Sequence, residues 1–525
     1  MKRVLSALLL VALAASLFVS CNQGPAQTAE FIMNNGTEPA TLDPSKISGV
    51  PEHKIYMALF EGLVINDPKT SKALPGVAES WTVSPDGLTI TYKLRKAVWS
   101  DGTPITAQTV VDSWLRTLNP ETGAEYSYMI NMVVKGAEAY NTAKGPASDV
   151  AIKAIDDRTF EVQLLGPMPY AVDMMSHYAF AILPMHVINA KGEEWIKVEN
   201  IVGNGPFKLL EWKPQESLTV VPNEKYWDAK SVKLAKITFL PIEDALTAYN
   251  KFKAGEIDWA HGVPLELIDE IKLRPDYQVA PQVATYYYIF NVTRAPFDNV
   301  LVRKAFAMAL NMQDVVDKVT KGGQLATTSM VPTMEGYTPA PGNGYNVEEA
   351  RKLLAEAGYP DGKGFPKVTL LYNTSEGHKK IAEWAQENWK KNLGIEIALT
   401  NQEWGTFLDT RQSSHDFQFC RAGWIGDYLD PNTFLDMFLS GSGLNDGLYA
   451  NAEYDALVRK AGTMAAGPER MEILRQAENF LVHEDQAVLP FYHYVEQDLI
   501  DLTKWDGWFP NPLGAHNWKF VGPKE

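Results

Sequence analysis

The chain has 525 residues, of which 46% are apolar and 21% charged, and its formal net charge is −16. This composition is typical of a folded globular protein and excludes a disordered chain, and the length predicts two or three domains. The acidic balance disfavours nucleic acid and anionic lipid surfaces as partners, because neither counterion release nor attraction to a basic patch is available.

The N-terminal residues have the layout of a secretion signal. Two basic residues precede an apolar run at 4–19, which ends at Ser20-Cys21. This run is too short for a comfortable membrane span and predicts a bacterial signal peptide at 1–20. A cysteine directly after a small residue predicts a lipoprotein in which Cys21 is acylated, and ordinary cleavage beside an incidental cysteine is the alternative. The polar stretch 21–28 is expected to be a flexible tether.

Two stretches have the alternating pattern of half-buried strands. Apolar and polar residues alternate at 88–94 and again at 160–164, which predicts a β-strand in each place. The turn residues Ser100-Asp101-Gly102 are expected to end the first strand, and Gly166-Pro167 the second.

Helical spacing follows later in the chain. Apolar residues recur at helical intervals in 302–309 and in 381–389, and Gly394 is placed to stop the second helix. The alternation at 395–399 then predicts the start of a strand. Helices and strands interleave throughout, which indicates a mixed α/β protein of several lobes, although periodicity does not say which segments share a lobe.

Aromatic residues are abundant, with 14 Trp, 22 Tyr and 21 Phe. They gather at 286–288, 491–494 and 505–509, beyond the needs of one core face. Amphipathic rings suit the walls of a ligand cleft between domains, where one end of a ring is dry and the other is wet.

The usual catalytic spacings are missing from the sequence. His483-Glu484 begins like a zinc-binding helix, but Ala487 stands where the second histidine is required, and Gly441-Ser442-Gly443 lacks the spacing of a nucleophile elbow. We therefore expect no enzyme, no cofactor and no metal site. Cys420 is the only cysteine besides Cys21, so acylation of Cys21 would leave no disulfide.

One carboxylate stands out by its apolar surroundings. Asp427 lies among Trp424, Ile425 and Tyr428, so we expect it to be partly desolvated and to need a cation. Two partners remain open at this point: Arg421 of the same segment, or the ammonium group of a ligand.

Several stretches together carry a family resemblance. The broader ones are 81–114, which includes Trp-Ser-Asp-Gly-Thr-Pro at 99–104, and then 204–209, 255–258 and 302–306. The more specific ones are 372–380, 402–411 and 421–427, the last reading Arg-Ala-Gly-Trp-Ile-Gly-Asp. From about residue 31 to about residue 500 the chain resembles the oligopeptide-binding proteins of bacterial peptide importers, within the family 5 solute-binding proteins.

The resemblance implies an α/β fold of the periplasmic-binding-protein type II kind, with two major lobes, an additional inserted lobe, and a ligand cleft between lobes. Lobe I would combine 29–60, 185–284 and 495–525, lobe II would be 61–184, and lobe III would be 285–494. The implied function is to bind short oligopeptides with little sequence specificity and to deliver them to an ABC transporter permease. The protein would act as a monomer in the periplasm or at the outer face of the cytoplasmic membrane, held there by its lipid anchor alone.

The resemblance also implies roles for individual residues. Asp427 would bind the α-ammonium of the peptide, and its main chain would pair with the backbone of Gly423, Ile425 and Val50. Arg411, Arg421 and His378 would meet the C-terminal carboxylate, while Trp404, Trp424 and Tyr128 would line side-chain pockets. His378 has an alternative interpretation as an exposed histidine at the start of a helix.

Two departures from the family pattern leave questions open. The disulfide of related proteins falls on Ala284 and Ile425 here and is therefore missing, and Lys318 and Lys321 are both candidates for a lysine that reaches longer peptides. Binding proteins for murein peptide, sugars, nickel chelates or haem are rivals within the family, and a secreted hydrolase is a rival outside it. Asp427 favours peptides over sugars, since a sugar offers no ammonium.

Overall fold

The computed structural model describes residues 29–525. The predicted signal peptide, Cys21 and the tether lie outside the described residues. Within the described part, no helix is both long enough and apolar enough to cross a membrane.

A large mixed sheet forms the framework of the molecule. Its long central strands β14 and β19 pair with each other and separate two sets of shorter strands. We call these sets the β1 side, which holds β10 to β13 and β1, and the β18 side, which holds β18, β16 and β17. In order across the sheet the strands are β10 (Phe207–Lys213), β11 (Ser217–Pro222), β12 (Leu234–Leu240), β1 (Ala29–Asn34), β13 (Trp259–His261), β19 (Val488–Ile500), β14 (Tyr277–Phe290), β18 (Phe419–Ile425), β16 (Thr369–Asn373) and β17 (Ala398–Gln402), and β15 (Leu325–Ala326) also pairs with β19.

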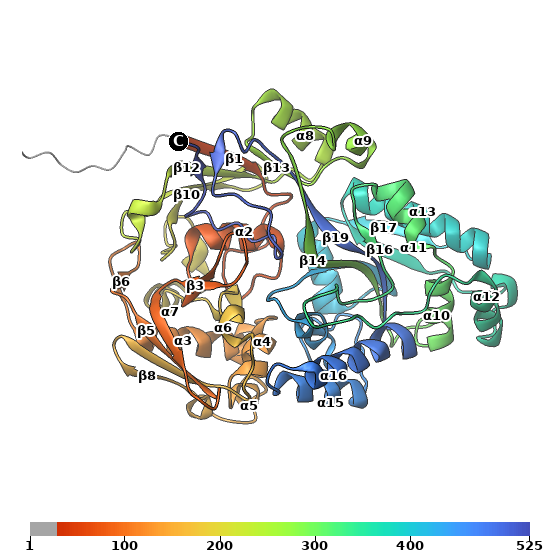
Figure 1. Cartoon of the computed structure of the whole chain (residues 1–525), viewed down its shortest axis with the longest axis horizontal. Coiled ribbons are helices and arrows are strands. Elements are labelled where there is room, and N and C mark those ends of the chain that lie inside the picture. Colours follow the sequence, from red (N-terminus) through yellow and green to blue (C-terminus); the bar gives the residue numbers. More distant parts are fainter. Residues whose placement is uncertain (1–28) are drawn as a thin grey trace, which may run out of the picture.

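A separate antiparallel sheet of four strands lies beside the β1 side (Figure 1). Three two-stranded ribbons complete the β-structure. The four strands are β4 (Ala78–Val83), β5 (Thr89–Leu94), β9 (Thr159–Gln163) and β8 (Ile152–Asp156), and the ribbons are β2 (Val64–Asn66) with β3 (Ala73–Pro75), β6 (Ala97–Val98) with β7 (Pro104–Ile105), and β20 (Trp505–Asp506) with β21 (Gly522–Pro523).

The helices fall into groups that follow these sheets. Helices α3 to α7 lie with the four-stranded sheet, α10 to α13 lie with the β18 side, and β14 and β19 run through the middle of the molecule between them (Figure 1). The helices are α2 (Val50–Leu59), α3 (Ala107–Leu118), α4 (Ser127–Val133), α5 (Ala137–Asn141), α6 (Ala171–Met174), α7 (Met185–Lys191), α8 (Ala245–Ala254), α9 (Ile268–Ile271), α10 (Val300–Met308), α11 (Met312–Val315), α12 (Val347–Glu356), α13 (Glu376–Leu393), α14 (Trp404–Leu408), α15 (Ala452–Gly462) and α16 (Pro468–Asn479).

The predicted periodic segments are confirmed in kind, with two shifts at their ends. The alternation at 88–94 and 160–164 forms β5 and β9, and the helical stretches form α10 and α13, which ends at Gly394 with a φ of 72°. The turn at 100–102 does not end β5; it connects β6 to β7. The strand after Gly394 begins only at Ala398, because Ile395 and Ile397 are buried in the core before pairing starts.

The tyrosine cluster differs from its expected place on a cleft wall. Tyr286, Tyr287 and Tyr288 are each at most 1% exposed. They lie in β14, which is paired on both edges, by β18 and β19, and packed on both faces. Rings on both faces of such a strand belong to the core.

Candidate ligand-binding site

One edge of β18 is left without a strand partner. β14 pairs with the whole strand from Phe419 to Ile425, but on the other edge β16 pairs only at Phe419 and Cys420. Over 421–425, no other strand of the described chain pairs with that edge. The backbone there is available for an added strand.

The backbone groups on this edge can be assigned from the bonds at the two ends of β18. The N–H of Asn291 donates to the carbonyl of Gln418 (2.9 Å), and the N–H of Gly426 donates to the carbonyl of Val283 (2.8 Å). Because pairing alternates along an antiparallel ladder, even-numbered residues of β18 face β14. The N–H and C=O groups of residues 421, 423 and 425 therefore point toward the open edge.

Asp427 follows this strand and is almost buried, with 10% of its side chain exposed. Its Oδ1 lies 3.2 Å from Nε2 of His177, while Oδ2 has no hydrogen-bond partner among the described residues. Nδ1 of His177 accepts from the N–H of Ala179, so the ring proton sits on Nε2 and donates to Asp427 without any need for positive charge. The backbone N–H of Asp427 donates to Oγ1 of Thr433, which fixes the loop.

Arg421 does not pair with Asp427, so the structure contradicts the internal ion pair that the sequence left open. Its guanidinium donates to Oδ1 of Asn373 (3.2 Å) and to the hydroxyl of Tyr494 (2.8 Å), and it lies 5.0 Å from the ring centre of Tyr286. These partners are neutral, and Nε has none. Within residues 29–525, Arg421 forms no ion pair with a carboxylate, so the charge of this half-buried side chain is uncompensated.

Gly423 lets the Arg421 side chain fold back along the strand. A Cβ atom at Gly423 would lie 2.9 Å from Nη2 of Arg421 and 2.9 Å from the Tyr494 hydroxyl. Any larger residue would displace the guanidinium from its place above position 423. The missing side chain thus brings the positive charge nearer to Asp427.

The other two predicted carboxylate-binding residues have different surroundings. Arg411 lies in the turn after α14, with Nε 2.7 Å from Oδ2 of buried Asp446. Burial raises the pKa of Asp446 to about 6, although the charge of Arg411 lowers it. His378 lies in the first turn of α13, half-buried against the ring of Tyr286 at 5.6 Å, so the interpretation as an exposed histidine is wrong. Burial, and then the charge of Arg421, lowers its pKa well below the usual range.

Each of the predicted aromatic residues contacts another ring. Trp424 is 8% exposed and stacks on Tyr126, with ring centres 6.3 Å apart. Tyr128 is buried beside Tyr126, and Trp404 stacks on Phe407 at 6.1 Å.

The predicted backbone positions lie where helices and strands end. Val50 is the first residue of α2, and Ile425 is the last residue of β18. Ile425 pairs directly with Ala284, so the two positions onto which the family resemblance maps a disulfide are neighbours across the strands here. Cys420 is a buried free thiol.

The two lysine candidates lie on the surface. Lys318 pairs with Asp314 at 2.8 Å, and Lys321 with Asp269 at 3.3 Å. Each already has a carboxylate partner on the surface.

Sequence reasoning missed several residues of this site. His177, Tyr126, Asn373, Tyr494 and Asp446 contact the predicted residues but come from other segments of the chain. The sequence singled out the segments of two of them, Tyr494 in the aromatic cluster 491–494 and Asn373 in the stretch 372–380, but no local spacing links any of the five to Asp427 or Arg421.

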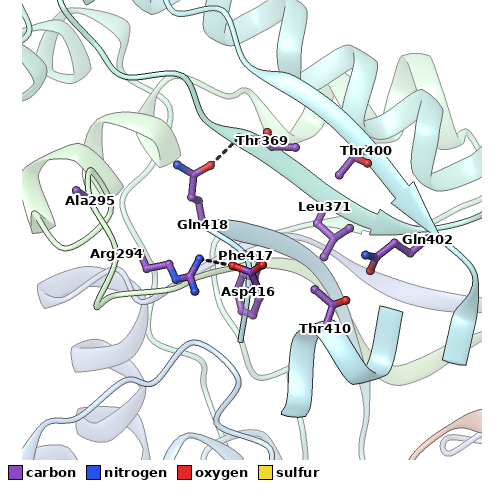
Figure 2. A pocket seen from close by; sticks show the side chains of 10 residues that line it. All are labelled: Arg294, Ala295, Thr369, Leu371, Thr400, Gln402, Thr410, Asp416, Phe417 and Gln418. Atoms are coloured by element: carbon purple, nitrogen blue, oxygen red, sulfur yellow. Dashed lines mark hydrogen bonds and ion pairs between the residues drawn. The ribbon is translucent and has the colours of Figure 1, made fainter. Parts of the chain in front are cut away.

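A separate cavity of about 360 Å³ lies beside β16 and β18 (Figure 2). None of the predicted site residues lines it. Arg294 and Asp416 in its wall pair with each other at 2.7 Å, and Gln418 accepts from the backbone N–H of Thr369. Because the two charges in its wall compensate each other, this cavity offers no uncompensated charge to a ligand.

Comparisons with known proteins place the chain in a family. Residues 72–446 match the family model "Bacterial extracellular solute-binding proteins, family 5 Middle". The periplasmic oligopeptide-binding protein OppA of Salmonella typhimurium is 38% identical over 95% of this chain and 93% of its own length. The structure of Haemophilus influenzae OppA in complex with the peptide RPPGFSPFR matches with a TM-score of 0.90 at 34% identity, over 96% of this chain and all of the other.

A third relative distinguishes two arrangements of the same fold. One structure of the murein tripeptide binding protein MppA of Escherichia coli matches at 34% identity with a TM-score of 0.90, over 95% of this chain and 99% of the other. Its unliganded open form reaches only 0.63 at the same identity, over 95% and 98%. The domains of this protein are therefore arranged as in the peptide complex and unlike the open form. By sequence and by structure, the chain belongs to family 5 of the bacterial extracellular solute-binding proteins.

Proposed function

We propose that this protein binds short peptides outside the cytoplasmic membrane and delivers them to an ABC importer, without making or breaking a bond. One observation carries the proposal: Asp427 and Arg421, two largely buried charges of opposite sign without a counter-charge in the described chain, flank the open edge of β18. A buried charge without a partner is strongly unfavourable, so each demands a counter-charge from a guest. A free peptide has such charges at its two ends.

The edge between these charges suits the main chain of an extended peptide. The ammonium end would meet Oδ2 of Asp427, and the chain would run antiparallel to β18, against the backbone of Gly423 and Ile425, with Val50 on the far side. The carboxylate would meet Arg421, with His378 beside it. Contacts to backbone and termini give affinity without reading side chains, and the aromatic residues Trp404, Trp424 and Tyr128 would line permissive pockets.

The fold of Arg421 over Gly423 sets the length of the guest. Positions 423 and 427 are four residue steps apart, or about 13 Å in extended backbone at ~3.3 Å per residue. A tri- or tetrapeptide has about that distance between its charged ends. Arg411 is already paired with Asp446, so Arg421 would be the main carboxylate partner.

Closure of lobes would enclose the peptide. We propose the lobes as 29–60 with 185–284 and 495–525, then 61–184, and 285–494. The contact of His177 with Asp427 and the stacking of Tyr126 on Trp424 cross from the second lobe to the third, which supports a closed state. The protein would act as a monomer, periplasmic or at the outer face of the membrane, with acylated Cys21 as its anchor.

Murein peptide is a second candidate guest, because the murein tripeptide binding protein fits this fold as well as the peptide complex does. The identity of the guest can be read directly. Mass spectrometry of the small molecules released when the purified protein is denatured should find peptides of narrow length, three or four residues, and varied sequence. A single compound without a free amino end would contradict the proposal.

Removing the positive charge of Arg421 should weaken the binding of peptides that have a free C-terminal carboxylate. Arg421→Met is expected to weaken binding of a tripeptide by about 10- to 100-fold, since a hydrogen bond to a charged group contributes about 1.5–3 kcal/mol. The same tripeptide with a C-terminal amide should bind the wild type weakly and lose little more in the variant. Calorimetry of both peptides against both proteins gives the coupling, and equal losses for acid and amide would show that Arg421 does not meet the carboxylate.

A further inference from the structure

A small cavity lies where three distant parts of the chain meet: the segment before and within α2, the loop before α4, and the residues after α14. Its volume is about 180 Å³, several times the ~30 Å³ that one water occupies in the liquid. We call it the junction cavity. Its polar lining consists of Lys46, Ser48, Glu52, Glu125, Asp409, Gln412 and Ser413.

Polar atoms without partners are concentrated in this lining. Glu52 is 2% exposed; its Oε1 accepts from the N–H of Ala40 at 2.7 Å, while its Oε2 forms no hydrogen bond of good geometry and faces the Trp404 indole, which lowers its pKa against the larger effect of burial. Gln412 is 9% exposed, and one end of its amide has no partner, while the other accepts from the Ser48 hydroxyl. Oε2 of Glu125 is also buried and without a partner. Buried polar atoms are nearly always hydrogen-bonded, so these three point to a polar guest.

The charge balance of the cavity is negative. Lys46 pairs with Glu193 at 3.1 Å outside the cavity, and Asp409 is an exposed carboxylate at its rim. Glu52 and Glu125 have no cation of their own among the described residues. A positive guest would compensate them.

The pKa of Glu125 is raised toward neutral pH. Burial raises its pKa to about 7, the charge of Asp446 adds to the rise, and Arg411 and the Ser48 hydroxyl lower it. Tyr126, next in the chain, faces it as well. Burial also raises the pKa of Glu52.

The cavity adjoins the proposed peptide site. Tyr126 feels the charges of both Asp427 and Glu125, after the larger effect of its burial, which raises its pKa. Val50 begins the helix that carries Glu52. The ring of Trp404 lies against Gly49, where a Cβ atom would be 2.8 Å from the indole.

We propose that the junction cavity holds the ammonium or guanidinium group of a basic side chain of the bound peptide, with Glu125 and Glu52 as its partners. This specificity rests on the proposed peptide binding. A metal ion is the poorer match, since no group of three or more histidine, cysteine, aspartate or glutamate side chains in residues 29–525 could hold one.

Calorimetry with matched tripeptides tests this assignment. Lys-Ala-Ala, Ala-Lys-Ala and Ala-Ala-Lys are compared with the same peptides containing norleucine, which has a side chain of similar length without the charge. At one of the three positions, the peptide with lysine should bind about tenfold more tightly at pH 8 than the matching peptide with norleucine, as expected for a charge-assisted contact. A cation favours the ionised carboxylate, so this preference should shrink as the pH falls through the pKa of Glu125 toward pH 6.

Three variants separate the role of the two buried carboxylates from a general loss of binding. Glu125→Gln should lose the preference for lysine at that position and its pH dependence, Glu52→Gln should weaken it, and the exposed Glu121→Gln should keep it. The norleucine peptides report whether each variant folds and binds. If they fail to bind the wild type, the proposed function is wrong; if they bind as tightly as the lysine peptides, only the present inference is overturned. A last measurement adds butylammonium, a free cation, to the norleucine peptides. If butylammonium strengthens their binding while the lysine peptides bind no more tightly than the norleucine peptides, the cavity takes a free cation and the assignment to the peptide side chain is overturned.

Discussion

Asp427→Ala should weaken the binding of a tri- or tetrapeptide by about two to four orders of magnitude. The variant leaves the ammonium of the peptide buried beside no carboxylate, a loss of about 3–5 kcal/mol for a broken buried pair. Oδ2 has no other partner in the described chain, and the contact from His177 reaches only Oδ1. Calorimetry with a peptide of defined sequence measures the change directly.

An N-acetylated peptide provides the control for Asp427. It carries no ammonium, so it should bind the wild type poorly and show little further loss in the variant. Asp361→Asn removes an exposed carboxylate on the β18 side, and it should leave affinity unchanged. A change of less than a few-fold in Asp427→Ala with the free peptide would refute the ammonium assignment.

Arg470→Met should lower the free energy of unfolding by about 3–5 kcal/mol, since it leaves a carboxylate buried and unpaired. Arg470 in α16 is fully buried, and its two terminal nitrogens each donate to an oxygen of Asp430 at 2.7 Å. Its Nε donates to the carbonyl of Ala461 at 2.9 Å, which ties α15 to α16. Denaturant unfolding of the purified protein measures the loss.

The same pair supports the binding loop. Asp430 lies three residues after Asp427, and its Oδ1 accepts from the N–H of Asn432 in the turn that follows. The double variant Asp430→Asn with Arg470→Met removes both charges and should recover much of the stability. A loss below about 1 kcal/mol in Arg470→Met alone would mean that Asp430 finds solvent or another partner.

Local patterns were enough to predict β5, β9, α10 and α13, which lie away from the binding edge. The alternation in β5 and the spacing in α10 and α13 depend on neighbours within a few residues, and the glycine stop at Gly394 is a local backbone requirement. The start of β17 was missed because Ile395 and Ile397 alternate like strand residues while they are buried before any pairing begins.

The binding edge itself could be predicted only in part. The apolar neighbours of Asp427 indicated a desolvated carboxylate, but the choice between Arg421 and a ligand depended on where the arginine side chain points. That direction depends on Gly423, Asn373 and Tyr494, which the fold brings together. The same holds for His177, 250 residues away from Asp427 in the chain.

The open edge of β18 also bears on whether the protein aggregates when no peptide is bound. Unsatisfied backbone donors and acceptors in a row are a template on which strands of other molecules can assemble, the first step toward fibrils and precipitates. In the closed arrangement, residues 421, 423 and 425 are only partly exposed. A bound peptide would pair with the open edge and cover its backbone groups. Without a peptide, only closure of the domains would limit the access of other protein strands to this edge.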